Sequence, residues 1–390
     1  MPYAKPCETQ YDAVIVGARC AGAATALLLA RAGAKILLVD RQKCGSDTVS
    51  THALMRAGVL QLKRWELLPN LMAAGTPRVT RTTFHYGEET IGIDIKREHG
   101  VDYLCAPRRT VLDHLLVEAA REAGAVVHHR VSLTDLQFGS DGRVTGAYLK
   151  DATGKEVSVT SDIVIGADGR QSMVARLAGA QIYAKGAGAS GYVYGYYNGV
   201  PNDGFHWYFE KDVAAGVIPT NENQHCLFVG VPRYRFAETF RKDLDGGFQR
   251  TAAANSPVLR DAIGRARLVG RLRGFAGSPG FLRQSYGPGW ALVGDAGYFK
   301  DPLTAHGITD ALRDAELLSN AVLNGRARAF VRYQDERDAL SRDLFDVTDA
   351  VASFNWDIDE IKDLHGRLSA AMKVEADRVA KFSPPTVLAA

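Results

Sequence analysis

The chain has 390 residues, of which 46% are hydrophobic and 23% are charged. This composition is that of a globular protein and excludes wholesale disorder. The 47 lysines and arginines nearly balance the 44 aspartates and glutamates, and the net charge of +3 argues against nucleic acid as a partner. At roughly 150 residues per domain, we expect about two or three domains. No apolar run approaches the ~18 residues of a membrane span, so no such span is predicted.

The N-terminus and the cysteines favour a cytoplasmic protein. Residues 1–17 lack the charged start, the long apolar segment and the cleavage site of a secretory signal. The cysteines are odd in number and form no CxxC pair, which favours reduced thiols over a disulfide framework or a zinc site, and no metal is predicted. They are Cys7, Cys20, Cys44, Cys105 and Cys226.

The first forty residues have the pattern of a strand, a helix and a second strand. Residues 12–17 form a short apolar run typical of a buried parallel strand. Residues 23–32 are rich in alanine and leucine and end at a glycine, as a helix does. The second apolar run, 35–39, ends in Asp40, 23 residues after Gly17. This spacing is typical of a dinucleotide-binding unit.

Each polar or small residue of this unit has an expected role. Gly17 makes the tight turn, and Gly22 lets the helix pack closely on the strand. The helix N-terminus faces a pyrophosphate, and Asp40 accepts hydrogen bonds from ribose. Arg19 stands where the middle glycine is usual, and its guanidinium could pair with phosphate oxygens. This unit alone does not distinguish NAD from FAD.

Two later motifs indicate FAD. An apolar strand from Asp162 ends in Asp168-Gly169, and another from Trp290 ends in Gly294-Asp295. A helical pattern follows from Gly307. Either dipeptide alone is weak, because Asp-Gly is usually only a turn. All three motifs in this order are a strong signal.

With these motifs the chain resembles the FAD-dependent monooxygenases of the p-hydroxybenzoate hydroxylase and geranylgeranyl reductase superfamily, over about residues 12–318. The resemblance implies a mixed α/β (α+β) fold with a glutathione-reductase-like FAD-binding Rossmann domain, an inserted β-sheet substrate domain and C-terminal helices. The predicted division is a discontinuous FAD-binding domain of residues 1–75, 101–180 and 271–330, a substrate domain of 76–100 and 181–270, and a helical segment of 331–390.

The resemblance also implies which residues hold FAD. Asp295 would bind the ribityl chain, Asp168 would lie near the pyrophosphate, and Arg109 would reach toward the cofactor from the start of a helix. Leu133 matches a position whose backbone touches adenine. The predicted cofactor-binding residues are Gly17, Arg19, Gly22, Asp40, Arg41, Arg109, Leu133, Asp168, Gly169, Gly294, Asp295, Pro302 and Gly307.

The implied reaction is hydroxylation of an aromatic or polyketide-like small molecule. NADH or NADPH would reduce the flavin, and O2 would add to give a C4a-hydroperoxide. Pro302 would lie beside the ring, and the helix after Gly307 would stabilise negative charge on the reduced flavin. His306 could donate a proton, because histidine titrates near neutral pH, or could only make a structural hydrogen bond.

Aromatic side chains at alternate positions predict two strands with one aromatic face each. Such a face could line a substrate pocket or fill a hydrophobic core, and the pattern leaves both open. The candidate substrate residues are Tyr192, Tyr194, Tyr196, Trp207 and Phe209. The loop that contains Thr51-His52 is a further candidate, since related flavoproteins bring it close to the cofactor.

Other functions share the same motifs. A geranylgeranyl-type reductase would need a long apolar tunnel. A flavin-dependent halogenase usually has a Trp-x-Trp-x-Ile-Pro segment and an essential lysine, and no two tryptophans here are so spaced. An oxidase or a FAD-loaded redox sensor would also keep these motifs. Residues 358–381 have an apolar stripe that could pack on the protein's own core or on a second subunit, so a monomer and a homodimer are both possible.

Overall fold

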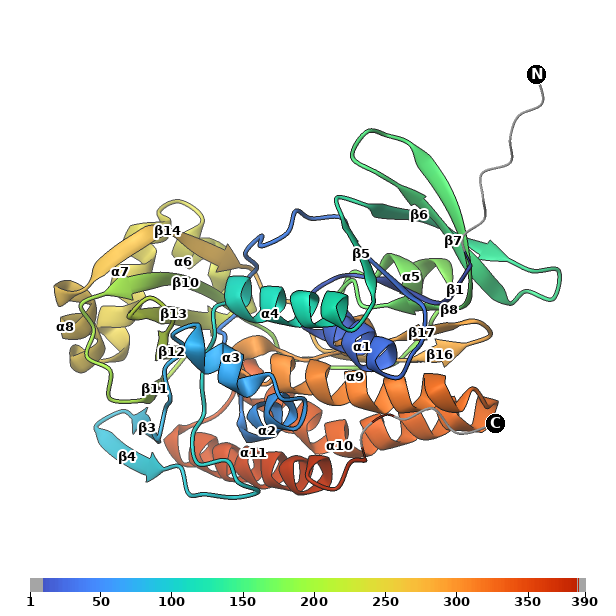
Figure 1. Cartoon of the computed structure of the whole chain (residues 1–390). Coiled ribbons are helices and arrows are strands. Elements are labelled where there is room, and N and C mark those ends of the chain that lie inside the picture. The colour runs from blue at the N-terminus through green and yellow to red at the C-terminus, as the bar shows by residue number, and fades with distance from the viewer. Residues whose placement is uncertain (1–9, 384, 386–390) are drawn as a thin grey trace.

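The computed structural model describes residues 10–383 and 385. Cys7 and most of residues 1–17, for which no secretory signal is predicted, therefore lie outside the described part of the chain. Two large sheets lie side by side, and a layer of long helices runs beneath both of them (Figure 1). The mixed α/β fold with C-terminal helices is confirmed. Among the described helices, none combines the length and the apolar character that a membrane crossing requires.

The first sheet has eight strands and a parallel centre. Its main order is β16-β17-β8-β1-β2-β5, with only β16 antiparallel to its neighbour, and the β6–β7 hairpin adds to β8. The central strands read as continuous apolar runs because both of their faces are buried. The strands are β1 (Gln10–Val16), β2 (Ile36–Asp40), β5 (Val126–His129), β6 (Ser132–Phe138), β7 (Val144–Lys150), β8 (Glu156–Gly166), β16 (Tyr286–Gly287) and β17 (Trp290–Leu292).

Helices cover both faces of this sheet. One face packs on α1, which lies between α4 and α9, while the short α5 packs on the other face (Figure 1). Their bounds are α1 (Cys20–Arg31), α4 (Arg109–Glu122), α5 (Met173–Leu177) and α9 (Gly307–Asn324). The apolar side chains of α1 and α4, such as Leu27, Leu112 and Leu116, are fully buried in this layer.

The second sheet has seven strands in the order β14-β10-β13-β12-β11-β3-β4. All neighbours are antiparallel except β11 and β3. The strands are β3 (Arg81–Tyr86), β4 (Glu89–Asp94), β10 (Ser190–Asn198), β11 (Phe205–Glu210), β12 (Val213–Thr220), β13 (Gln224–Pro232) and β14 (Arg267–Phe275). The sheet thus takes its strands from residues 81–94 and 190–275, while the domain boundaries stay a prediction.

The alternation in β10 places its side chains in two different cores. Tyr192, Tyr194 and Tyr196 join an aromatic cluster under the sheet, and Val193 and Tyr197 join a second cluster above it. The second cluster is covered by three short helices: α6 (Phe236–Phe240), α7 (Leu244–Asn255) and α8 (Pro257–Arg265).

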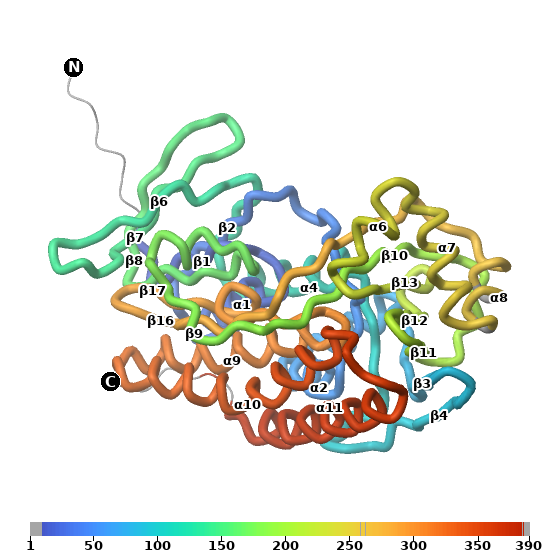
Figure 2. The backbone as a smooth tube through the Cα atoms, turned by 180° about the vertical axis from the view of Figure 1, so that it is seen from behind, coloured from blue at the N-terminus to red at the C-terminus, as the bar shows by residue number. Residues whose placement is uncertain are grey.

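The chain crosses from the first sheet to the second through β9 (Figure 2). This strand pairs with β15, which pairs with β18, in a small third sheet. Its strands are β9 (Ile182–Lys185), β15 (Phe281–Arg283) and β18 (Tyr298–Phe299), and single 3₁₀ turns lie at Arg233–Arg235, Gly294–Ala296 and Pro302–Thr304.

The long C-terminal helices pack on the protein's own core. Ile361 and Leu368 are buried in the aromatic cluster, and Leu364 and Met372 pack against it. The apolar stripe of residues 358–381 is therefore explained within one chain, without a second subunit. The remaining helices are α2 (Arg56–Arg64), α3 (Leu68–Ala73), α10 (Ala327–Ser353) and α11 (Ile358–Val379).

Candidate cofactor and substrate site

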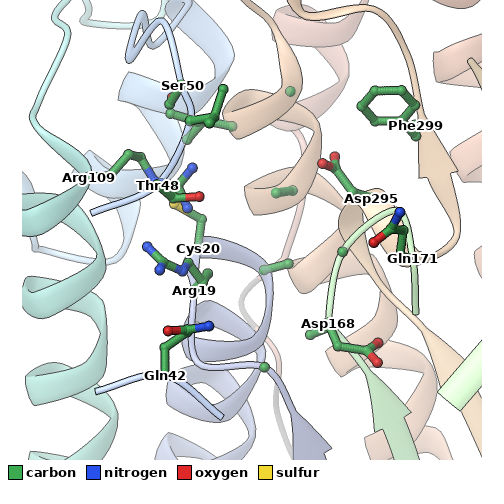
Figure 3. A pocket seen from close by; sticks show the side chains of 18 of the residues that line it. Arg19, Cys20, Gln42, Thr48, Ser50, Arg109, Asp168, Gln171, Asp295 and Phe299 are labelled. Atoms are coloured by element: carbon green, nitrogen blue, oxygen red, sulfur yellow. The ribbon is translucent and has the colours of Figure 1, made fainter. Parts of the chain in front are cut away.

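A cavity of about 870 Å³ opens at the carboxyl ends of the parallel strands. Its size is near the upper end of the ~300–1,000 Å³ of small-molecule sites, and its position is where open α/β sheets bind ligands. Side chains from α1, α4, the loop after β2 and the segments after β8 and β17 line it (Figure 3). Residues that are hundreds of positions apart in the chain meet here because parallel strands end at one edge.

Two glycines, one in the turn before α1 and one in its first turn, lie where a side chain has no room. A Cβ on Gly17, whose φ is +109°, would lie 2.4 Å from the carbonyl oxygen of Ala167. A Cβ on Gly22 would lie 1.8 Å from the carbonyl oxygen of Gly17. Gly22 therefore acts through packing and does not itself line the cavity, as expected for this glycine.

The start of α1 is suited to an anion. Cys20 and Ala21, in its first turn, line the cavity, and no acidic residue lies in that turn. The preceding Arg19 makes no side-chain hydrogen bond to the helix. The free N–H groups and the helix dipole therefore favour a phosphate here.

Asp40, at the end of β2, lines the cavity. Its Oδ2 accepts a hydrogen bond from Ala18 N and its Oδ1 accepts one from Gln42 N, both at 2.7 Å. The carboxylate thus fixes the glycine turn and still has lone pairs for ribose hydroxyls. Arg41 and Leu133 line the same part of the cavity.

Two arginines share one aspartate between α1 and α4. Arg19 Nη1 lies 3.0 Å from Asp113 Oδ2, and Arg109 donates to both oxygens of the same carboxylate at 3.1 and 3.2 Å. Arg19 also donates to Ser46, so its guanidinium is held in the cavity wall. Burial alone would lower the pKa of Arg109, but Asp113 raises it above its usual range. The group has one excess positive charge beside the start of α1.

The two acidic motifs differ in what their carboxylates do. Asp168 accepts hydrogen bonds from Ser172 Oγ at 2.5 Å and from Met173 N at 2.6 Å, so it supports the turn into α5, and burial raises its pKa. Gly169 lines the cavity beside it. Asp295 faces into the cavity (Figure 3). Its carboxylate is open to the cavity space but enclosed by protein, and this burial raises its pKa to about 6.

The start of α9 also points at the cavity. Gly307 and Ile308 line it together with Pro302, so the N-terminus of this helix can stabilise negative charge. Gly294 does not line the cavity. Its φ is +59°, and a Cβ there would come within 2.8 Å of the Ala21 side chain.

His306 lies behind this wall and is not among the described residues that line the cavity. Its Nδ1 is 3.2 Å from Asp310 Oδ1, and its Nε2 is 2.8 Å from Glu375 Oε2. Burial would lower the pKa of His306, but the two carboxylates raise it above its ordinary value. This environment supports the structural alternative for His306, and its role as a proton donor stays a prediction.

The three groups His306, Asp310 and Glu375 lie close enough together to suggest metal ligands. Cations of the protein already contact them, however. Lys300 Nζ contacts Asp310, and Arg313 Nη1 lies 2.7 Å from Glu375 and 3.2 Å from Asp310. The cluster is therefore best described as a buried ion network that joins α9 to α11.

The aromatic candidates are placed differently from one another. Tyr192 lines the cavity. Tyr194 donates to Thr48 O at 3.3 Å, and the Tyr196 hydroxyl pairs with His52, so both contact the loop after β2. Trp207 and Phe209 pack in the aromatic cluster under the sheet, which agrees with the alternative that these side chains fill a hydrophobic core. The assignment of all five aromatic residues to the substrate stays a prediction.

Several lining residues were not expected from the sequence. Lys300 and Phe299 follow the Gly-Asp motif and line the cavity, as does Gln171 after the Asp-Gly motif. Asp47 to Ala53 line it as a continuous stretch, which includes Thr51 and His52 of the loop that the sequence indicates as a candidate. Of these residues, only this stretch could be recognised in the sequence as a candidate for the site, because polar residues and His52 follow the apolar run of the second strand.

Comparison with known proteins identifies the family. The model of the FAD-binding domain family matches residues 10–348, so the chain belongs to this family, and the predicted FAD-binding superfamily is confirmed. A digeranylgeranylglycerophospholipid reductase of Methanococcoides burtonii is 28% identical over 326 residues, which cover 81% of this chain and 74% of that protein.

Solved structures show the same fold. A triple mutant of the flavin-dependent brominase Bmp2 superposes with a TM-score of 0.82 at 18% identity and covers 96% of each chain. PqsL of Pseudomonas aeruginosa, a probable FAD-dependent monooxygenase, has a TM-score of 0.78 at 19% identity, over 94% of this chain and all of that one. The protein is thus an FAD-dependent oxidoreductase that acts on a small molecule, and the cavity described above fits FAD.

Proposed function

We propose that the protein is a flavin-dependent reductase that takes electrons from NADH or NADPH and saturates a carbon–carbon double bond of a small molecule. The observation that supports this is the sequence match with an archaeal lipid reductase, which runs through most of both chains. Bound FAD supplies the two-electron chemistry, and the protein supplies position and charge.

The residues of the cavity have consistent roles in this proposal. The N-terminus of α1 and Arg109 would hold the pyrophosphate, and Asp40 would hold the ribose. Asp295 would accept a hydrogen bond from the ribityl chain. The N-terminus of α9 would face the flavin ring and favour its reduced, anionic form.

Hydroxylation with O2 is the second candidate. Tyr192 and Phe299 both line the cavity, and two aromatic walls suit a flat substrate. Halogenation finds less support, because the described lysine on the cavity wall, Lys300, has its ammonium held by Asp310 in the buried ion network.

Anaerobic stopped-flow experiments test the proposal. The FAD-loaded protein is first mixed with NADH or NADPH, and the reduced protein is then mixed with geranylgeranyl diphosphate under nitrogen. The proposal expects reoxidation of the flavin without O2 and a product that has gained two hydrogen atoms per reduced bond.

Three other results would contradict the proposal. Reoxidation that requires O2, with transfer of an oxygen atom to 4-hydroxybenzoate, would indicate a hydroxylase. Rapid formation of hydrogen peroxide in proportion to substrate would indicate an oxidase. Failure of both nucleotides to reduce the flavin would indicate a separate electron donor, as in the halogenase alternative.

A further inference from the structure

Asp47, which lines the cavity, is shared by two arginines that stand behind it and are not themselves among the lining residues. Arg273 on β14 donates from Nη1 to Asp47 Oδ2 at 2.6 Å, and Nη2 of Arg108 lies 3.5 Å from the same oxygen. Asp47 lines the cavity, and its side chain is 13% exposed. The two guanidinium groups therefore have one positive charge that their shared carboxylate does not balance. We call Arg108 and Arg273 the arginine pair.

Arg108 has unused hydrogen-bonding capacity. Its guanidinium stacks 3.5 Å from the centre of the Tyr196 ring, and its Nη1 donates to Gln224 Oε1 at 3.0 Å. Its Nε is buried and has no hydrogen-bond partner among the described residues. A guanidinium offers five N–H donors in a planar fork that matches carboxylate and phosphate oxygens. Stacking on the tyrosine fixes the plane of this fork before a ligand binds.

A histidine beside the arginine pair has a ring nitrogen without a hydrogen-bond partner among the described residues. His52 is fully buried, lines the cavity and has a φ of +65°. Its Nε2 pairs with the Tyr196 hydroxyl, whereas its Nδ1 has no partner within the described part of the chain. A buried polar atom left without a partner is costly, so a bound ligand is a natural partner for it.

The charges that shift the pKa of His52 are all positive. Burial lowers the pKa of His52 well below its usual value, and Arg109, Arg108 and Arg273 lower it further. The imidazole is therefore neutral and can donate or accept a hydrogen bond at Nδ1. Three arginines thus act on one corner of the cavity, where Asp47 is the balancing carboxylate of the arginine pair and Arg109 has its own partner in Asp113.

We propose that this corner binds an anionic group of the substrate, a carboxylate or a phosphate, between the two members of the arginine pair, with His52 Nδ1 as an additional contact. The inference rests on the proposed function in so far as the substrate enters the cavity beside FAD. Arg273 is 35% exposed, so an anion can approach it from solvent. Asp47 then acts as an internal competitor for the same guanidinium groups.

Titration calorimetry on the FAD-loaded protein at fixed ionic strength tests this directly. The probes are benzoate and inorganic phosphate, with benzamide as the neutral analogue of benzoate. We expect benzoate to bind at least about tenfold more tightly than benzamide, on the scale of one charge-assisted hydrogen bond. Arg273→Met should weaken benzoate binding by about ten- to a hundredfold, and Arg273→Lys should restore part of it.

Two further variants distinguish a site from a general effect of charge. Asp47→Asn should tighten benzoate and phosphate binding several-fold, because it removes the competing carboxylate. Arg271→Met is the matched control: Arg271 lies on the same strand, is exposed and has no ion pair among the described residues, so the probes should bind as in the parent. The proposal would be overturned if Arg273→Met and Arg271→Met lost benzoate affinity equally, or if Asp47→Asn did not gain affinity for the two anions.

The nucleotide is the other possible source of an anion. If Arg273→Met weakened the binding of NADPH but not of NADH, and left benzoate unaffected, the arginine pair would recognise the nucleotide phosphate, and the inference about the substrate would be wrong. Failure of the proposed reduction has a different signature, since anion binding would persist in a protein that does not reduce a double bond.

Discussion

Asp295 connects the proposed cofactor site to a measurable affinity. Its carboxylate faces the cavity, at the end of the third sequence motif. Replacing Asp295 with alanine removes a charged hydrogen-bond acceptor, which contributes about 1.5–3 kcal/mol. Because 1.4 kcal/mol corresponds to a factor of ten, the Kd for FAD should rise about 10- to 150-fold. Titration of the apoprotein with FAD, followed by quenching of flavin fluorescence, measures this change.

The pH dependence of the same affinity tests the cause. Burial raises the pKa of Asp295 to about 6, although Arg109 opposes the shift. Only the ionised carboxylate is a strong acceptor, so FAD binding should be constant well above pH 6 and weaken as the pH falls below it. The limiting slope is about tenfold per pH unit. In Asp295→Asn this dependence should disappear, because the amide does not titrate.

A control variant separates a local from a general effect. Asp335 lies exposed on α10 and is not among the residues that line the cavity, so Asp335→Ala should leave FAD affinity unchanged. If Asp295→Ala held FAD as tightly as the parent, the carboxylate would not contact the cofactor. If Asp295→Asn kept the pH dependence of the parent, another group would be responsible for it.

Three further predictions concern folding. Gly22→Ala should overpack the first turn of α1, lower the free energy of unfolding by about 1–3 kcal/mol and abolish FAD retention. Gly366→Ala, with open space around the new Cβ, should change neither the stability nor FAD retention. Urea unfolding measures the stability, and the flavin absorbance of the purified proteins measures FAD retention. Glu375→Gln should lower the free energy of unfolding by about 3–5 kcal/mol, because it leaves buried cations unpaired, whereas Glu336→Gln at a surface pair should cost at most about 1 kcal/mol. Equal costs would contradict a buried network. Because the folded protein raises the pKa of His306, the stabilisation by its charged form is complete below its unfolded pKa of about 6.5 and is lost as pH rises through the folded value. Melting temperatures between pH 5 and 9 should show this loss in the parent and not in His306→Gln.

The end of the cavity that the sequence motifs form could be predicted from local sequence patterns. Gly17 and Gly22 are required by backbone contacts that no other residue permits. Asp40 ends a strand and Asp295 follows one, and the apolar runs of both strands are visible in the sequence. Parallel strands bring such ends to one edge, whatever the separation along the chain. Spacing and strand type therefore suffice for this part.

The other end could not be predicted in this way. A period of two assigns Tyr192 and Trp207 to faces of strands, but both faces of this sheet are covered, so the pattern does not distinguish a cavity from a core. His306 follows a recognised motif, yet its partner Glu375 comes from α11, almost seventy positions later. Contacts between separate helices have no signature in one sequence.

The distribution of charge along the cavity links its two ends. Twice, two arginines share a single aspartate: Arg19 and Arg109 with Asp113, and Arg108 and Arg273 with Asp47. The first group lies at the start of α1, where the free N–H groups and the helix dipole favour a phosphate. The second lies across the loop that contains His52, beside the aromatic strand β10. Since each group has one unbalanced positive charge, the cavity wall is positive at Arg19 and Arg109, and a second positive region lies behind Asp47. If the proposed anion site is correct, a neutral apolar substrate would gain nothing from the second group, whereas a substrate with an acidic end would be oriented by it.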